Sequence, residues 1–160
     1  MTWAELPQDY WAHLPQIDGA EVIKRWACRW YDGPLSGIAF YRDRPCFFDD
    51  RGGLEDDVRQ RVDEDGETWN DWHKRFVLIE LTPAQYQEEA RRHELFCEKV
   101  GTHNSFDEAG QRLSGEARVI RSQEMRLDYY EAAEKWKPLS FADNPVIGWF
   151  EWLWASAESL

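Results

Sequence analysis

Apolar and polar residues alternate over residues 22–48, and this pattern predicts two or three β-strands joined by short turns. From Val22 onward, every second residue belongs to a mainly apolar series: Val22, Lys24, Trp26, Cys28 and Trp30. Successive side chains of a strand point to opposite faces, so we expect this series to share one buried face of a sheet. Asp32-Gly33-Pro34 and Arg42-Asp43-Arg44 are the expected turns. The segment therefore reads as an antiparallel meander.

Two helices are predicted further along the chain. The first runs from Pro83 to Val100 and begins at a T-x-x-Q capping box, after which apolar residues recur on one helical face. The second runs from Gln123 to Trp136, with a serine before it and a proline soon after it. Both segments are long enough to pack along a sheet.

Apolar runs at residues 72–81 and 146–154 predict further strands on either side of these helices. The expected fold class is therefore α+β, with an antiparallel sheet of about five strands and the two main helices packed on one face. We expect a single domain over residues 1–155, followed by a frayed tail at residues 156–160.

Composition and charge narrow the classes of function. The chain has 160 residues and a net charge of −12, which argues against direct binding to nucleic acid or to an anionic membrane. It has three cysteines without C-x-x-C spacing, and neither a signal-like start nor an apolar run of membrane length. These features predict a cytoplasmic protein with free thiols, and Cys28 and Cys46 are expected to be buried.

Residues 49–71 concentrate the negative charge, with ten carboxylates against three arginines. Spaced apolar residues indicate a short helix at about residues 54–62, and the rest is expected to leave the sheet as a water-exposed acidic excursion. Together with an unusual content of ten tryptophans, this segment suggests a surface that docks on a basic protein partner. The residues expected to contact that partner are Asp56, Asp57, Asp63, Glu64, Asp65, Trp69 and Trp72.

A non-enzymatic binding or regulatory protein is thus the leading hypothesis, and an accessory, inhibitor or immunity protein of bacterial or phage type fits its profile. The sequence of this chain has neither G-x-x-x-x-G-K nor G-x-G-x-x-G, so no phosphate-binding loop and no cofactor are expected.

Two alternatives stay open. The helical segment His93-Glu94-Leu95-Phe96-Cys97 resembles H-E-x-x-H with a cysteine in place of the second histidine. In a small metal-dependent hydrolase, His93, Cys97 and His103 would be the metal ligands, and Glu94 or His103 would act in catalysis. The other alternative is a small-molecule binder with an aromatic-lined pocket between the sheet and the helices.

Overall fold

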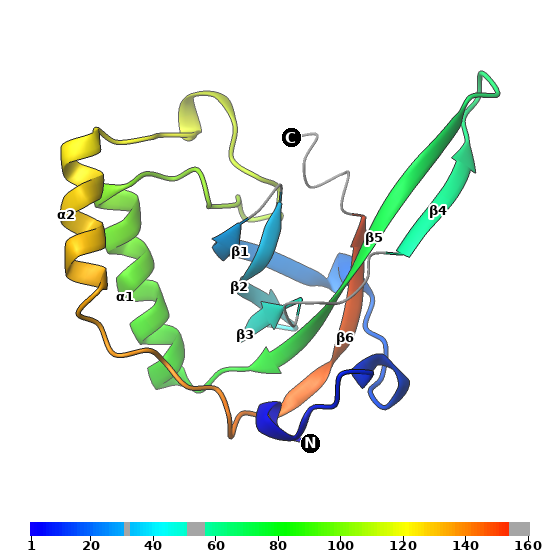
Figure 1. The fold of residues 1–160 in the computed structure, drawn as a ribbon, viewed down its shortest axis with the longest axis horizontal. Coiled ribbons are helices and arrows are strands. Elements are labelled where there is room, and N and C mark those ends of the chain that lie inside the picture. The colour runs from blue at the N-terminus through cyan, green and yellow to red at the C-terminus, as the bar shows by residue number, and fades with distance from the viewer. Residues whose placement is uncertain (31–32, 51–56, 154–160) are drawn as a thin grey trace.

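The computed structural model describes residues 1–30, 33–50 and 57–153, with the backbone alone at Asp57, Val58, Trp72 and Leu153. In this part of the chain six antiparallel strands form one sheet, and two α-helices lie together beside it (Figure 1). The predicted α+β class is confirmed. Asp56 and the tail at residues 156–160 lie outside the described residues. None of the helices described is long and apolar enough to span a membrane.

The strand order is β1-β2-β3-β5-β4, and β6 pairs with β5 outside this path. The strands are β1 Val22–Trp30, β2 Pro34–Tyr41, β3 Arg44–Asp49, β4 Asp57–Val62, β5 Thr68–Glu80 and β6 Val146–Leu153. Strands β1 to β3 are the meander that the alternation predicts. Strand β5 is the hub of the sheet, because β3 and β4 share one of its edges and β6 occupies the other.

The sheet curls, so that its inner face packs against itself. Lys24 of β1 lies over the ring of Trp152 of β6, with Nζ 3.9 Å from the ring centroid, although these strands are at opposite ends of the path through β5. Buried aromatic rings from β3, β5 and β6 meet on the same face: Phe48, Phe76 and Phe150. Burial of these rings away from water stabilises the curl.

The outer face of the sheet is covered by helix α1, Pro83–Lys99. Its residues Tyr86 and Ala90 pack against Trp26, Ile38 and Leu81. The predicted capping box is present, since the Thr82 side chain accepts from the Gln85 amide and the Gln85 side chain accepts from the Thr82 amide. The box fixes where the helix begins relative to the end of β5.

Helix α2, Gln123–Ala133, lies beside α1, and the rings of Phe96 and Tyr129 join the two helices at a centroid distance of 5.5 Å. Over the β5–β6 part of the outer face, N-terminal 3-10 turns take the place of the helices, and Leu6 and Tyr10 pack on Val77 there.

Two bulges in β1 change the face to which its side chains point. The pairing with β2 shifts between Lys24 and Trp26, and again between Ala27 and Arg29. An inserted residue reverses the alternation of a strand. Val22 therefore lies in the inner core, whereas Trp26 packs on the outer face against α1. The prediction that the series from Val22 to Trp30 shares one face is wrong.

The second bulge also explains the state of one cysteine. Cys28 lies between the paired residues Ala27 and Arg29 and is exposed, whereas Cys46 in β3 is buried. The prediction of burial is thus wrong for Cys28 and confirmed for Cys46.

The prediction of a helix at residues 54–62 is wrong for residues 57–62, which form β4, and residues 54–56 lie outside the described part of the chain. Their partner is the first half of β5, with Val62 opposite Thr68, so β5 begins four residues before the predicted start at Trp72. The acidic segment therefore continues the sheet as a hairpin. In the first strand of this hairpin, residues 59–62 are all exposed.

Gly37 provides a test of the bulged pairing of β1 with β2. A Cβ at this position would lie 2.1 Å from the carbonyl oxygen of Trp26 and 2.8 Å from the Ala27 Cα. We expect Gly37→Ala to lower the free energy of unfolding by about 3 kcal/mol, because neither backbone atom can move aside freely. Urea unfolding measures this. Gly66→Ala is the control, since that glycine has a positive φ but no neighbouring atom within 4 Å, and a cost of about 1 kcal/mol is expected. Equal costs would contradict the close approach.

Candidate functional site

The β4–β5 hairpin, residues 57–71 and here called the arm, projects away from the helices and from the curled part of the sheet (Figure 1). Between Arg59 and Asn70 every residue is exposed except Asp63, which is half-buried. A ribbon of two strands with both faces in water gains little from apolar burial. The arm must therefore be held by contacts of its own.

Asp63 supplies most of the contacts at the tip of the arm, which comprises residues 62–69. One carboxylate oxygen accepts from the amides of Asp65 and Glu67, both at 2.9 Å. The other accepts from the indole N–H of Trp69 at 2.7 Å. The Trp69 indole first, and the Glu67 and Asp65 amides after it, hold the pKa of the Asp63 carboxyl below its ordinary value. Asp63 thus shapes the turn, and Gly66 completes it with φ +81°.

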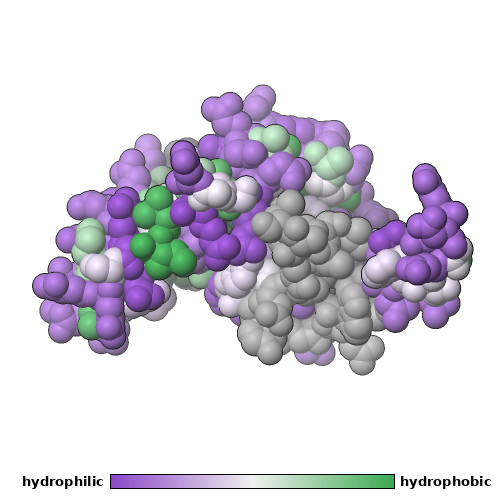
Figure 2. Space-filling view, turned by 90° about the horizontal axis from the view of Figure 1, so that it is seen from above, coloured by the Kyte–Doolittle hydropathy of each residue, from purple (hydrophilic) through white to green (hydrophobic). Residues whose placement is uncertain are grey.

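The two arginines of the arm are paired with carboxylates. Arg59 donates to Glu151 of β6 at 2.9 Å, and Arg61 donates to Asp71 across the hairpin at 2.9 Å. The tip beyond them has no basic residue, and its surface is mostly hydrophilic at the right of Figure 2. Three exposed carboxylates there accept no hydrogen bond within the tip: Glu64, Asp65 and Glu67.

Two large side chains stand in water next to these carboxylates. Val62 is 68% exposed and Trp69 is 48% exposed. The guanidinium of Arg61 lies 5.9 Å from the Trp69 ring centroid, so this indole is held between a cation and the Asp63 carboxylate. Trp69 is thus fixed on one face of the ribbon beside the acidic turn, whereas Val62, opposite Thr68, is exposed on the other face.

The structure brings together four of the seven residues that the sequence singles out for partner binding: Asp63, Glu64, Asp65 and Trp69. Asp57 and Trp72 lie in β4 and β5, where the backbone alone is described, and Asp56 is outside the described residues. Sequence reasoning missed Val62 and Glu67. The available signal was the Asp65-Gly66 pair between two polar strands, which is a hairpin turn signal.

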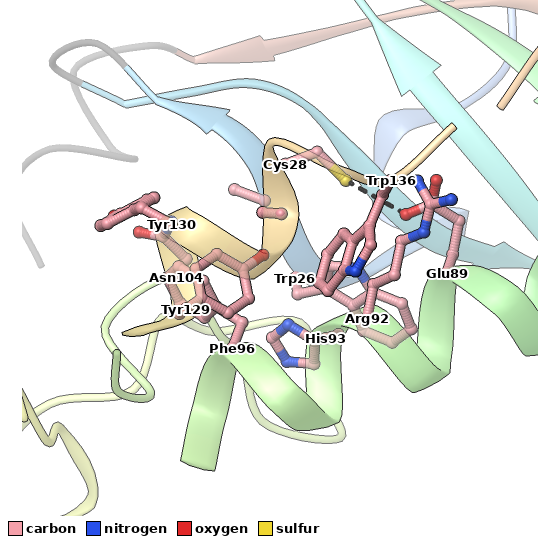
Figure 3. Close-up of a pocket in the computed structure, with 12 residues that line it drawn as sticks. Trp26, Cys28, Glu89, Arg92, His93, Phe96, Asn104, Tyr129, Tyr130 and Trp136 are labelled. Atoms are coloured by element: carbon pink, nitrogen blue, oxygen red, sulfur yellow. Dashed lines mark hydrogen bonds between the residues drawn. The ribbon is translucent and has the colours of Figure 1, made fainter. Parts of the chain in front are cut away.

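A second candidate site is a groove of about 330 Å³ between β1, α1 and α2. Five aromatic side chains line it together with His93: Trp26, Phe96, Tyr129, Tyr130 and Trp136. Figure 3 shows these rings around an opening that also receives Cys28, Glu89 and Arg92. The groove exists because the bulge in β1 turns Trp26 toward α1, while α2 stands off from the sheet and contacts α1 instead.

The charged groups of the groove differ in their partners. Arg92 donates to the Glu88 carboxylate at 2.9 Å and to the backbone oxygen of Lys137 at 2.8 Å. Glu89 accepts from the thiol of Cys28, at the long distance of 3.9 Å (Figure 3). Burial raises the pKa of Glu89, and the nearby Arg92 opposes this change. The carboxylate of Glu89 is thus partly removed from water with one weak donor.

His93 and Cys97 are neighbours, as their spacing on a helix requires. Cys97 Sγ lies 3.3 Å from His93 Nε2, and the buried hydroxyl of Ser105 lies 3.0 Å from the same nitrogen. The imidazole stacks on Trp26 at a centroid distance of 4.4 Å and 4° between the planes. Burial lowers the pKa of His93 to about 4, so it is neutral at pH 7. These contacts fasten the Ser105 loop to α1 and to β1.

The other residues of the metal alternative are placed elsewhere. His103 contacts the ring of Phe96, and Glu94 is exposed on α1. Among the described residues, no three His, Cys, Asp or Glu side chains gather into a group that could hold a metal ion. Burial raises the pKa of the Cys97 thiol.

Comparison with protein-family models, with curated proteins and with solved structures gives no match to this chain. The arm and the groove are therefore the features of this chain that bear on its function.

The half-buried His93 predicts a loss of stability in mild acid. Unfolding restores its pKa from about 4 to the ordinary 6.5. Between these two values the unfolded chain binds a proton that the folded chain does not, so the free energy of unfolding falls as the pH falls, by up to about 3 kcal/mol. Urea unfolding at a series of pH values measures this loss, and His93→Gln should remove it. His13→Gln is the control, because His13 is half exposed. An unchanged pH dependence in His93→Gln would contradict the assignment.

Proposed function

We propose that this chain is a non-enzymatic binding protein that docks on a basic protein surface through the tip of the arm. The observation that supports this proposal most directly is the tip itself. Trp69 is exposed there on one face of the ribbon and Val62 on the other, beside Glu64, Asp65 and Glu67, and the tip beyond Arg61 has no basic residue. Aromatic side chains are common anchors of protein interfaces, and a rim of like charges steers a partner of opposite charge.

The energetics of the arm favour this function over a purely structural one. Its residues from Arg59 to Asn70 cover no core, since all of them except Asp63 are exposed. Even so, the Asp63 network and the Arg61–Asp71 ion pair hold the tip in one shape. A preorganised tip loses little conformational entropy when it binds, which improves affinity. Contacts that shape a segment without supporting the core are typical of binding loops.

The composition of the chain supports a more specific role and a location in the cell. An accessory, inhibitor or immunity protein acts by docking alone, and the chain's acidic surface suits such a role. Cys28, Cys46 and Cys97 are all free, which supports a location in the reducing cytoplasm.

The aromatic groove favours a second function, the binding of a small molecule. It lies between sheet and helices, as such sites often do, and rings line most of it. This function is compatible with docking, because the groove and the arm are at opposite ends of the molecule (Figure 1).

Charge reversal at the tip tests the docking proposal. In Glu64→Lys/Asp65→Lys/Glu67→Lys the Asp63 side chain stays in place, so the turn keeps its hydrogen bonds. We expect capture of basic proteins from the cytoplasm of cells that express the native chain to fall about tenfold or more, because the steering charge is inverted. Quantitative mass spectrometry of the captured proteins measures this, and urea unfolding should give an unchanged stability.

The matched control is Glu94→Lys/Glu108→Lys/Glu131→Lys, which changes the net charge by the same amount at exposed positions outside the arm. Its capture should equal that of the native chain. If both triple variants lose the same proteins to the same extent, capture reflects total charge and the arm is not the docking element. Trp69→Ala separates the apolar anchor from the charge and should weaken capture at high salt as well.

A further inference from the structure

We infer that the aromatic groove between β1, α1 and α2 binds an organic cation, with an ammonium group against Glu89 and an apolar body against the aromatic rings. This inference goes beyond docking by the arm. The two sites share no residue, so the failure of one leaves the other standing.

The first argument is the state of Glu89. Its carboxylate lines the groove, partly out of water, and its one hydrogen-bond donor is the Cys28 thiol at 3.9 Å. Removing a carboxylate from water without full compensation costs free energy. A ligand that brings a positive charge to this oxygen recovers that cost. The groove is thus built around an acceptor that the protein itself satisfies poorly.

The second argument is the kind of wall that surrounds this carboxylate. Phe96, Tyr129 and Trp136 pack edge to face in sequence, with centroid distances of 5.5 Å for each neighbouring pair. Figure 3 shows the Tyr129 and Trp136 rings on two sides of the opening, with Glu89 beyond Trp136. Aromatic faces attract cations, and the attraction grows when the cation has lost its water. Rings and a carboxylate together select an organic ammonium over a metal ion.

One guanidinium, that of Arg92, also lines the groove, and its hydrogen bonds go to groups other than Glu89. Arg92 lines the groove as well, but its guanidinium is bound to Glu88 and to the Lys137 carbonyl and lies 5.2 Å from the Trp136 ring centroid. Glu88 pairs with Arg91 as well, so its charge is shared by two guanidiniums and Arg92 still acts on Glu89, but Glu89 has no ion pair of its own among the described residues. The imidazole of His93 is neutral and stacked on Trp26, so it adds no charge.

Three probes of similar size test the charge of the ligand: phenethylamine, which is a cation at neutral pH, the neutral 2-phenylethanol and the anion 3-phenylpropionate. Titration calorimetry gives the affinities, and the indole N–H signals of Trp26 and Trp136 in nuclear magnetic resonance spectra locate the site. We expect phenethylamine to bind with a dissociation constant on the order of 1 mM or tighter, and the other two about tenfold more weakly.

Two pairs of variants assign the contact. Glu89→Gln keeps the shape of the side chain and should weaken phenethylamine binding about tenfold, whereas Glu94→Gln, an exposed control on the same helix, should leave it unchanged. Tyr129→Phe keeps the ring and should bind nearly as the native protein does, while Tyr129→Leu should bind several-fold more weakly. The inference is overturned if no probe binds, if the neutral probe binds equally well, or if 3-phenylpropionate is preferred, which would assign the groove to an anion at Arg92.

Discussion

The length of β5 is the constraint on which the rest of the structure depends. This strand has 13 residues, whereas β3 and β4 on its one edge have six each. Its second half pairs with both β3 and β6 and supplies Phe76, Val77 and Leu78 to the core. Its first half continues past the end of β3 and is left with β4 as a partner until β6 begins. A strand that outruns its sheet must either end or project, and here it projects as the arm.

The same sheet produces the groove through a different irregularity. A bulge in β1 turns Trp26 out of the curled core and onto the face that α1 covers. There the indole stacks on His93, and this contact sets how α1 lies across β1. Helix α2 then packs on α1 instead of on the sheet, and the space between them keeps its aromatic walls. The bulge between Lys24 and Trp26 in β1 therefore places Trp26 in the wall of the groove and not in the inner core.

Regular local patterns in the sequence were sufficient to predict much of the fold. Alternation predicted the meander, and the capping box at Thr82 predicted the start of α1 correctly. Bulges leave no signal in a single sequence, because they depend on which residues of two strands meet. The burial of Cys28 and the shared face of Val22 and Trp26 were mispredicted for that reason.

The candidate sites were predictable to different degrees. The acidic segment was expected from its charge, but its first strand was taken for a short helix, because exposure of both faces removes the polar–apolar alternation that marks an ordinary strand. An aromatic-lined pocket between the sheet and the helices was one of the alternatives that the sequence left open, but the sequence did not single out Glu89. Its role depends on Cys28 of β1, which is 61 residues distant in the chain and close in space.

Amide hydrogen exchange along β5 tests most directly whether the arm is a folded ribbon held out in water. The bond from the Asp63 amide to Glu67 sets the alternating pattern of the hairpin, so the amides of Trp69 and Asp71 bond to β4. Those two amides should exchange much more slowly than in an unstructured chain, and faster than the amides of Val77 and Ile79, which open with the whole fold. Protection of Trp69 and Asp71 equal to that of Val77 and Ile79 would mean that the arm is packed into the core, and no protection would mean that it is not a hairpin in solution. Either result would contradict this account.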